Sequence, residues 1–138
     1  MRATAQSAFR TEMILAREAY RQRQYDDFWH HLERAHVVGQ RYFWAHLVTH
    51  LWMLRFAVQS ADFREAAGQL TRIMAVPLAY LSGWVPVGNT GGANVSPIKP
   101  MPVPPDLQPF FVGYSLRREI GFRLVLLCIA AALAWAWG

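Results

Sequence analysis

All five histidines of this 138-residue chain lie between residues 26 and 60. Three of them have spacings that could place them together: His36 follows Glu33 by three positions, and His46 and His50 are four positions apart. Residues three or four apart share one face of a helix. If both segments are helices that fold back on each other, three imidazoles and one carboxylate point toward the same space.

Histidine nitrogens and carboxylate oxygens are common ligands of divalent transition metals, and helical bundles build metal sites from Glu-x-x-His patterns. The sequence therefore predicts a site for zinc, iron or copper with the ligands Glu33, His36, His46 and His50. A second interpretation stays open, because buried histidines can be structural, with hydrogen bonds to backbone, tyrosine or threonine groups.

Apolar residues recur every three or four positions through residues 1–81, which predicts an all-α fold with a small bundle of three to four helices. The expected helices are Ser7–Gln22, Tyr25–Val38, Arg41–Gln59 and Phe63–Ala75, the last continuing past a kink at Pro77. In the last helix the side chains expected to be buried are Leu70, Ile73 and Met74. Four titratable side chains are expected at the surface: Glu12, Glu18, His30 and His31.

Residues 82–110 contain seven of the eight prolines, together with four glycines, and this density excludes regular structure. Apolar residues are interspersed throughout, so we expect an irregular arm packed on the bundle rather than a free linker. The turn Gly88–Gly92 could cradle an anion, but it lacks the lysine of a nucleotide-binding loop, and a plain turn is the favoured interpretation.

Residues 111–138 end in an unbroken apolar run from Leu124 to Trp137. With the preceding apolar residues it approaches the roughly 20 residues that cross a bilayer. Arg117 and Arg118 lie just before it, as the positive-inside rule expects. The segment is therefore expected to be a membrane anchor that contacts lipid. The alternative is a terminal helix docked on the bundle, although the run lacks the polar stripe of such a helix.

The charge distribution, the cysteine content and the N-terminal sequence exclude several classes of function. The formal net charge is +5, but the arginines form no dense block with interleaved aromatics, so no nucleic-acid partner is expected. The single cysteine, Cys128, lies in the apolar tail, and no nucleophile motif of a hydrolase is present. The N-terminus lacks the apolar core of a signal peptide, so the globular part is expected at the cytoplasmic face of a bacterial inner membrane.

Two resemblances go beyond composition. The stretch Ala19–Phe28, followed by Leu32 and Ala35, resembles one tetratricopeptide-type helical hairpin, without a second repeat. A larger resemblance, over residues 8–107, is to an uncharacterised bacterial family, the domain of unknown function 3703. It is carried by Leu32–Gln40, His46, His50, Gly88–Gly91, Pro100–Pro102 and Asp106–Leu107. That family has no established activity; the resemblance implies that the histidines and the arm form one unit, with the arm over the histidine face.

Two functions follow from these patterns. The first is a small membrane-anchored protein that binds a transition metal through the inward-facing His/Glu cluster. The second is a non-catalytic protein-interaction module tethered to the inner membrane, with structural histidines and a protein partner. Convergence of the predicted ligand atoms distinguishes them, because metal-bound nitrogens lie about 2 Å from a common centre.

Overall fold

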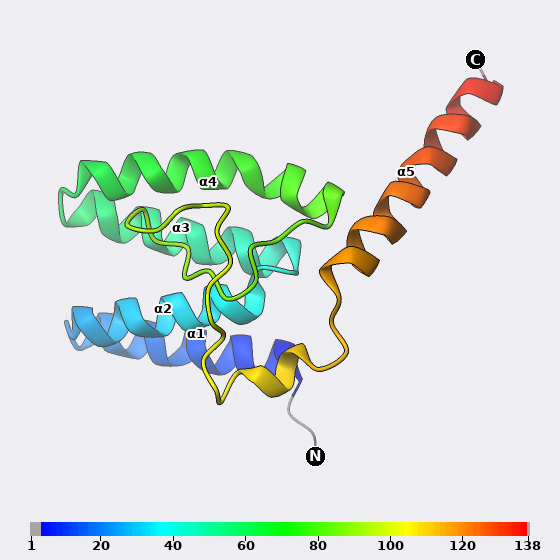
Figure 1. Cartoon of the computed structure of the whole chain (residues 1–138). Coiled ribbons are helices and arrows are strands. Elements are labelled where there is room, and N and C mark those ends of the chain that lie inside the picture. Colours follow the sequence, from blue (N-terminus) through cyan, green and yellow to red (C-terminus); the bar gives the residue numbers. More distant parts are fainter. Residues whose placement is uncertain (1–3, 138) are drawn as a thin grey trace.

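The structure is a computed structural model that describes residues 4–137. Within that range it contains five α-helices, one short 3₁₀ helix and no strand, which confirms the predicted all-α class (Figure 1). The helices are α1 (Ala5–Arg21), α2 (Tyr25–Gly39), α3 (Phe43–Gln59), α4 (Phe63–Ser82), η1 (Gln108–Phe111) and α5 (Leu116–Trp137).

Helices α1 to α4 form two antiparallel hairpins, α1–α2 and α3–α4, that lie one on the other through α2 and α3 (Figure 1). The short connections between the helices favour this arrangement. Phe28 is fully buried at the centre and contacts the rings of Tyr20, Trp52 and Phe56. The buried core cluster consists of Met13, Ala16, Ala19, Phe28, Leu32, Ala35 and Met53.

Helix α4 faces the opposite way from the prediction. Leu70 and Met74 are 54% and 77% exposed, whereas Gln69 is fully buried and Ile73 is half-buried. The prediction that Leu70 and Met74 are core residues is therefore wrong. The physical reason is that Gln69 and its neighbour Arg72 hydrogen-bond to the groups beneath α4, so the polar face of the helix is the one that finds partners inside the protein.

The arm between α4 and η1 runs back across α3 and α2 instead of leaving the bundle (Figure 1). Arg72 of α4 donates to the carbonyl oxygens of Gly92 and Val95, at 2.9 and 2.8 Å. The Glu65 carboxylate, also on α4, accepts from the backbone N–H of Ala93 at 2.8 Å. These contacts satisfy arm backbone groups that no regular element would pair.

A second correction concerns α1 and α2. Glu12 is buried, because its carboxylate accepts from Arg34 Nε at 2.8 Å and lies 2.8 Å from His31 Nδ1. Arg34 also pairs with Asp106 near the end of the arm. The expected surface position of Glu12 is therefore wrong, whereas His31 is partly exposed; both take part in a network that ties α1, α2 and the arm together. Glu18 and His30 are exposed as expected.

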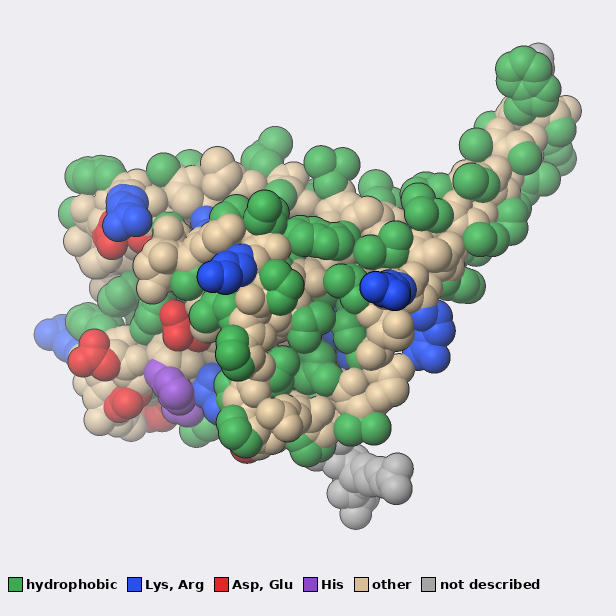
Figure 2. Space-filling model, viewed as in Figure 1, with side chains coloured by type: hydrophobic (Ala, Val, Ile, Leu, Met, Phe, Trp, Pro, Cys, Tyr) green, Lys and Arg blue, Asp and Glu red, His purple; other side chains and the backbone are tan. Residues whose placement is uncertain are grey.

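Helix α5 extends away from the bundle, and none of its residues, all of which lie in the described range, is buried (Figure 1). Together with η1 it forms a stretch, Gln108–Trp137, that is long and apolar enough to cross a membrane. Figure 2 shows hydrophobic side chains along its whole length. Its link to the bundle includes a hydrogen bond of 2.6 Å from Arg123 Nη1 to the carbonyl oxygen of Tyr80.

The core predicts a measurable contrast between two phenylalanines. Phe28→Ala is expected to lower the free energy of unfolding by about 3–5 kcal/mol, because it removes a buried ring and leaves a cavity. Phe63→Ala is the matched control, since Phe63 is 82% exposed. Urea unfolding of the full chain in mild detergent, followed by near-ultraviolet circular dichroism, measures both. Equal losses in the two variants would contradict this core.

Candidate metal centre

Three histidines converge at the junction of α2, α3 and the arm. His50 Nε2 lies 3.2 Å from His36 Nε2 and 3.0 Å from His46 Nε2. The three potential ligand atoms lie within 4.8 Å of one another. The ring centroids form a nearly equilateral triangle with sides of 4.8, 4.7 and 4.8 Å. The three rings therefore present their Nε2 atoms to one small space.

The local fold explains this convergence. His36 lies in the last turn of α2, and His46 and His50 lie one turn apart on α3. The chain reverses between Gly39 and Tyr42, where the Tyr42 N–H donates to the Gly39 carbonyl at 2.8 Å. A reversal this short brings the end of α2 against the beginning of α3, so residues on their inner faces meet.

Burial keeps the three imidazoles neutral. It is the largest cause of the lowered pKa of each ring, which is about 3 for His46, about 4 for His50 and well below its ordinary value for His36. The neighbouring rings lower the pKa values of His36 and His46 further, because two imidazolium ions at this distance repel each other. At neutral pH each ring therefore carries one proton and one free lone pair.

The arm fixes the proton of His36. Its Nδ1 lies 2.8 Å from the carbonyl oxygen of Asn89, which can only accept a hydrogen bond. The side chain of Asn89 is itself held, because its Nδ2 donates to the carbonyls of Ser96 and Lys99 at 2.8 Å each. The His36 proton therefore belongs on Nδ1, and its Nε2 carries the lone pair.

A chain of polar groups on α4 fixes the proton of His50 in the same way. His50 Nδ1 lies 2.6 Å from Gln69 Oε1. The Gln69 amide nitrogen donates to Glu65 Oε1 at 2.6 Å and to the Gly91 carbonyl at 2.9 Å, and both are acceptors. This sets the orientation of the amide, so its oxygen faces His50 and receives the Nδ1 proton. The Nε2 of His50 is therefore also unprotonated.

The consequence is a contact that a hydrogen bond cannot explain. His36 Nε2 and His50 Nε2 lie 3.2 Å apart with a lone pair on each. His46 can donate from its own Nε2 to His50 but leaves the His36–His50 contact without a proton. A cation at the centre resolves this, since nitrogens bound at about 2.0–2.1 Å to a tetrahedral metal lie roughly 3.3 Å apart.

A cavity of about 220 Å³ opens beside the three rings. Its lining is mainly apolar and includes Val76, Trp84, Pro86 and Ile98. Arg72 also lines it, and the charge of this guanidinium lowers the pKa of both His36 and His50. The histidines therefore face a space large enough for a water or a small ligand, not solid protein.

Of the four predicted ligands, the structure brings together His36, His46 and His50 and leaves Glu33 outside this group. Glu33 is half-buried on α2, and burial raises the pKa of its carboxyl group. The carboxylate connected to the centre is instead that of Glu65, which reaches His50 through Gln69.

Sequence reasoning missed the groups that surround the ligands: Glu65, Gln69, Arg72 and the backbone of Asn89. The spacing of Gln69 and Arg72 could have predicted a polar inner face of α4, because two polar residues three positions apart share a helix face. The arm covers the histidines as the family resemblance implied, with Gly91 against the His36 ring. The Gly88–Gly92 segment is a turn whose Gly91 N–H donates to Asn89 Oδ1.

Comparison with known proteins identifies the family. Residues 3–111 match the family model described as protein of unknown function (DUF3703), and the chain belongs to this family. The matched range contains the four-helix bundle, the three histidines and the arm. No curated protein matches the chain. No solved structure matches it either.

Gly91 allows a direct test of the contact between the arm and His36. A Cβ at this position would lie 2.7 Å from His36 Cδ2, and the φ angle is +85°. Gly113→Ala is the matched control, because Gly113 has a φ of +77° but nothing within 4 Å of the added Cβ. We expect Gly91→Ala to lower the thermal unfolding temperature clearly more than Gly113→Ala. Equal shifts would mean that backbone strain alone is responsible and that the arm does not pack on His36.

Burial of the histidines also sets a pH dependence. Below about pH 6.5 the unfolded chain protonates its histidines, whereas the folded protein keeps His50 neutral to about pH 4 and His46 to about pH 3. The metal-free protein is therefore expected to lose stability as the pH falls from about 6.5 to about 4, by about 1 kcal/mol per pH unit for each buried histidine. Urea unfolding in the presence of a chelator measures this slope.

The control for this experiment is His30→Asn, because His30 is exposed and its replacement should leave the slope unchanged. His46→Gln should reduce it. A stability that stays flat between pH 7 and pH 5 in the wild type would show that the three rings are accessible to protons in the folded protein.

Proposed function

We propose that this protein is a membrane-anchored metal-binding protein that holds one divalent transition metal ion through Nε2 of His36, His46 and His50. The single observation that carries the proposal is the pair of Nε2 lone pairs on His36 and His50, facing each other at 3.2 Å. Each lone pair is set by an acceptor on the opposite side of its ring, which is how metal-binding proteins orient histidine ligands.

The alternative of purely structural histidines explains the geometry less well. Structural imidazoles form hydrogen bonds from one nitrogen to an acceptor and accept a bond at the other. Here the outer nitrogens of His36 and His50 are satisfied, but their inner nitrogens are both acceptors. An unpaired buried polar contact is unfavourable by about 1–3 kcal/mol, and a bound cation turns the same contact into ligation.

Three neutral imidazoles suit zinc, copper or iron, and they leave the charge of the ion unneutralised. Arg72 adds positive charge beside the cavity. A small anion from the cavity, such as hydroxide, offsets this charge as a fourth ligand, which another neutral group would not do. A site with three protein ligands and one open position is typical of centres that bind an exogenous ligand, whereas structural zinc sites are closed by four protein ligands.

The anchoring part of the proposal rests on α5. None of its described residues is buried, and its apolar side chains from Phe122 to Trp137 are exposed, so in water they would form a large unpartnered apolar surface. Arg117, Arg118 and Arg123 lie near its first turns, and by the positive-inside rule we expect the bundle on the cytoplasmic side. The metal centre then lies in the bundle, close to the membrane surface.

Elemental analysis of the full chain purified in detergent tests the metal centre. We expect close to one zinc, copper or iron ion per chain, retained through dialysis, and its loss in a His46→Ala, His50→Ala double variant. His30→Ala is the matched control and should keep the metal, because His30 is an exposed histidine outside the centre.

Two further measurements make the result decisive. Near-ultraviolet circular dichroism must show that the double variant is folded, so that lost metal reports lost ligands. Metal is also added back to the wild type after chelation. A folded wild-type protein that stays metal-free with zinc, copper and iron would overturn the proposal and leave the histidines structural.

A further inference from the structure

The outer face of the second hairpin is apolar, which is unusual for a surface that faces water. Along α4 the exposed apolar side chains recur at helical spacing: Phe63, Leu70, Met74, Leu78 and Leu81. Trp44 at the start of α3 is 72% exposed. Figure 2 shows hydrophobic side chains along the edge of the bundle formed by α4, continuing to those of α5. These residues of α4 face outward because Gln69 and Arg72 turn the polar side of α4 toward the interior.

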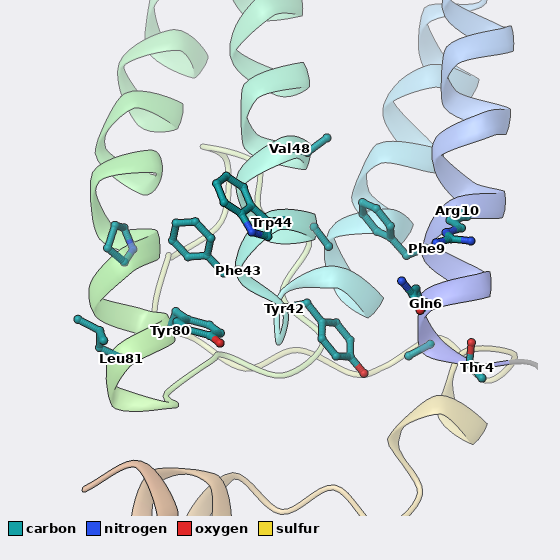
Figure 3. Close-up of a pocket in the computed structure, with 13 residues that line it drawn as sticks. Thr4, Gln6, Phe9, Arg10, Tyr42, Phe43, Trp44, Val48, Tyr80 and Leu81 are labelled. Atoms are coloured by element: carbon teal, nitrogen blue, oxygen red, sulfur yellow. The ribbon is translucent and has the colours of Figure 1, made fainter. Parts of the chain in front are cut away.

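An apolar groove adjoins this face at the end of the bundle from which α5 departs. Its volume is about 1000 Å³, and it lies between the beginning of α1, the beginning of α3 and the end of α4. Figure 3 shows the aromatic rings of Phe43 and Trp44 at the beginning of α3 and of Tyr42 just before it, with Tyr80 and Leu81 opposite them on α4. Tryptophan and tyrosine are the residues enriched at membrane–water interfaces.

Arg123 connects this end of the bundle to the beginning of the apolar run of α5. Its Nη1 donates to the Tyr80 carbonyl at 2.6 Å, and its guanidinium lies 4.3 Å from the centre of the Tyr80 ring. Arg123 directly precedes the apolar run of α5, where an arginine reaches toward the headgroups. If α5 crosses the membrane, the end of α4 is therefore held at the level of the headgroups.

The charges around the base of α5 complement anionic lipid. Arg117, Arg118 and Arg123 lie in the first turns of this helix, with Glu119 as the acidic residue among them. Arg41 lies nearby and stacks on the ring of Tyr114 at 4.1 Å. A basic surface next to exposed apolar residues is the pattern by which proteins bind the surface of anionic membranes.

We infer that the bundle rests on the bilayer through the outer face of α4 and that the adjoining groove takes the acyl chain of a phospholipid, with anionic headgroups near the arginines. This inference rests on the proposed anchoring by α5 and adds a second, lateral membrane contact to it. The bundle would then have a fixed orientation to the membrane, because a second contact prevents it from rotating about the anchor. The metal centre inside the bundle would share that orientation.

The first test uses nanodiscs that hold one full-length chain each, in a mixture of phosphatidylcholine and phosphatidylglycerol. Lipids with brominated acyl chains quench tryptophans that reach the hydrocarbon. The difference between wild type and Trp44→Phe isolates the contribution of Trp44, and the double variant Trp135→Phe, Trp137→Phe isolates that of the anchor. We expect both contributions to be quenched. If Trp135 and Trp137 are quenched but Trp44 is not, the lateral contact is overturned and the anchor by α5 is retained. If none of the three is quenched, both the lateral contact and the anchor are overturned.

A second test measures shielding of α4 with an aqueous maleimide, in a Cys128→Ala background. Leu78→Cys is compared with Ile14→Cys on α1, because these positions are 70% and 65% exposed. In the nanodiscs Leu78→Cys is expected to react about tenfold more slowly than Ile14→Cys, as for residues on the apolar face of an interfacial helix. Equal rates would overturn the inference. Shielding that appears only when two chains share a disc would overturn it too, in favour of a second copy as the occupant.

Discussion

The arrangement of this protein depends on the hydrogen bonds that the Nδ1 atoms of His36 and His50 form on the side away from the metal centre. The Asn89 carbonyl sets the proton of His36, and the Glu65–Gln69 pair sets the proton of His50. Each contact links a different element to the ligands: the arm in one case and α4 in the other. The long irregular arm and the inward polar face of α4 therefore have one common physical explanation, because both supply acceptors to buried imidazoles.

The same constraint explains the surface of the bundle. Gln69 and Arg72 turn inward to reach His50 and the arm, and Leu70 and Met74 of α4 turn outward. An amphipathic helix in a water-soluble bundle has the opposite orientation. The exposed apolar residues of α4 are consistent with the proposal that the second hairpin lies against lipid, next to a helix that crosses the membrane. Helix α4 would then support the metal centre with its inner face, through Gln69, and contact the membrane with its outer face.

Much of the fold could be predicted from the sequence, since the helical periodicity and the short connections determine the bundle. The convergence of the three histidines also followed from spacing, because positions three or four apart share a helix face. Glu33 was chosen by the same rule, but spacing gives only the face of a helix and not the reach of a side chain. The supporting groups could not be predicted: Gln69 and Asn89 come from α4 and the arm, whose placement depends on tertiary contacts. Leu70 and Met74 were misplaced because hydrophobicity alone does not determine which residues of a helix are buried.

The measurement that tests this account most directly is long-range ¹H–¹⁵N NMR of the full chain, metal-free and labelled at histidine, in detergent at neutral pH. It reports which ring nitrogen carries the proton in each imidazole. We expect His36 and His50 to be neutral rings protonated at Nδ1, and the Nε2 signals to shift when zinc is added. A proton on Nε2 of either ring would contradict it, because the lone pair would then face the backbone or the amide instead of the centre.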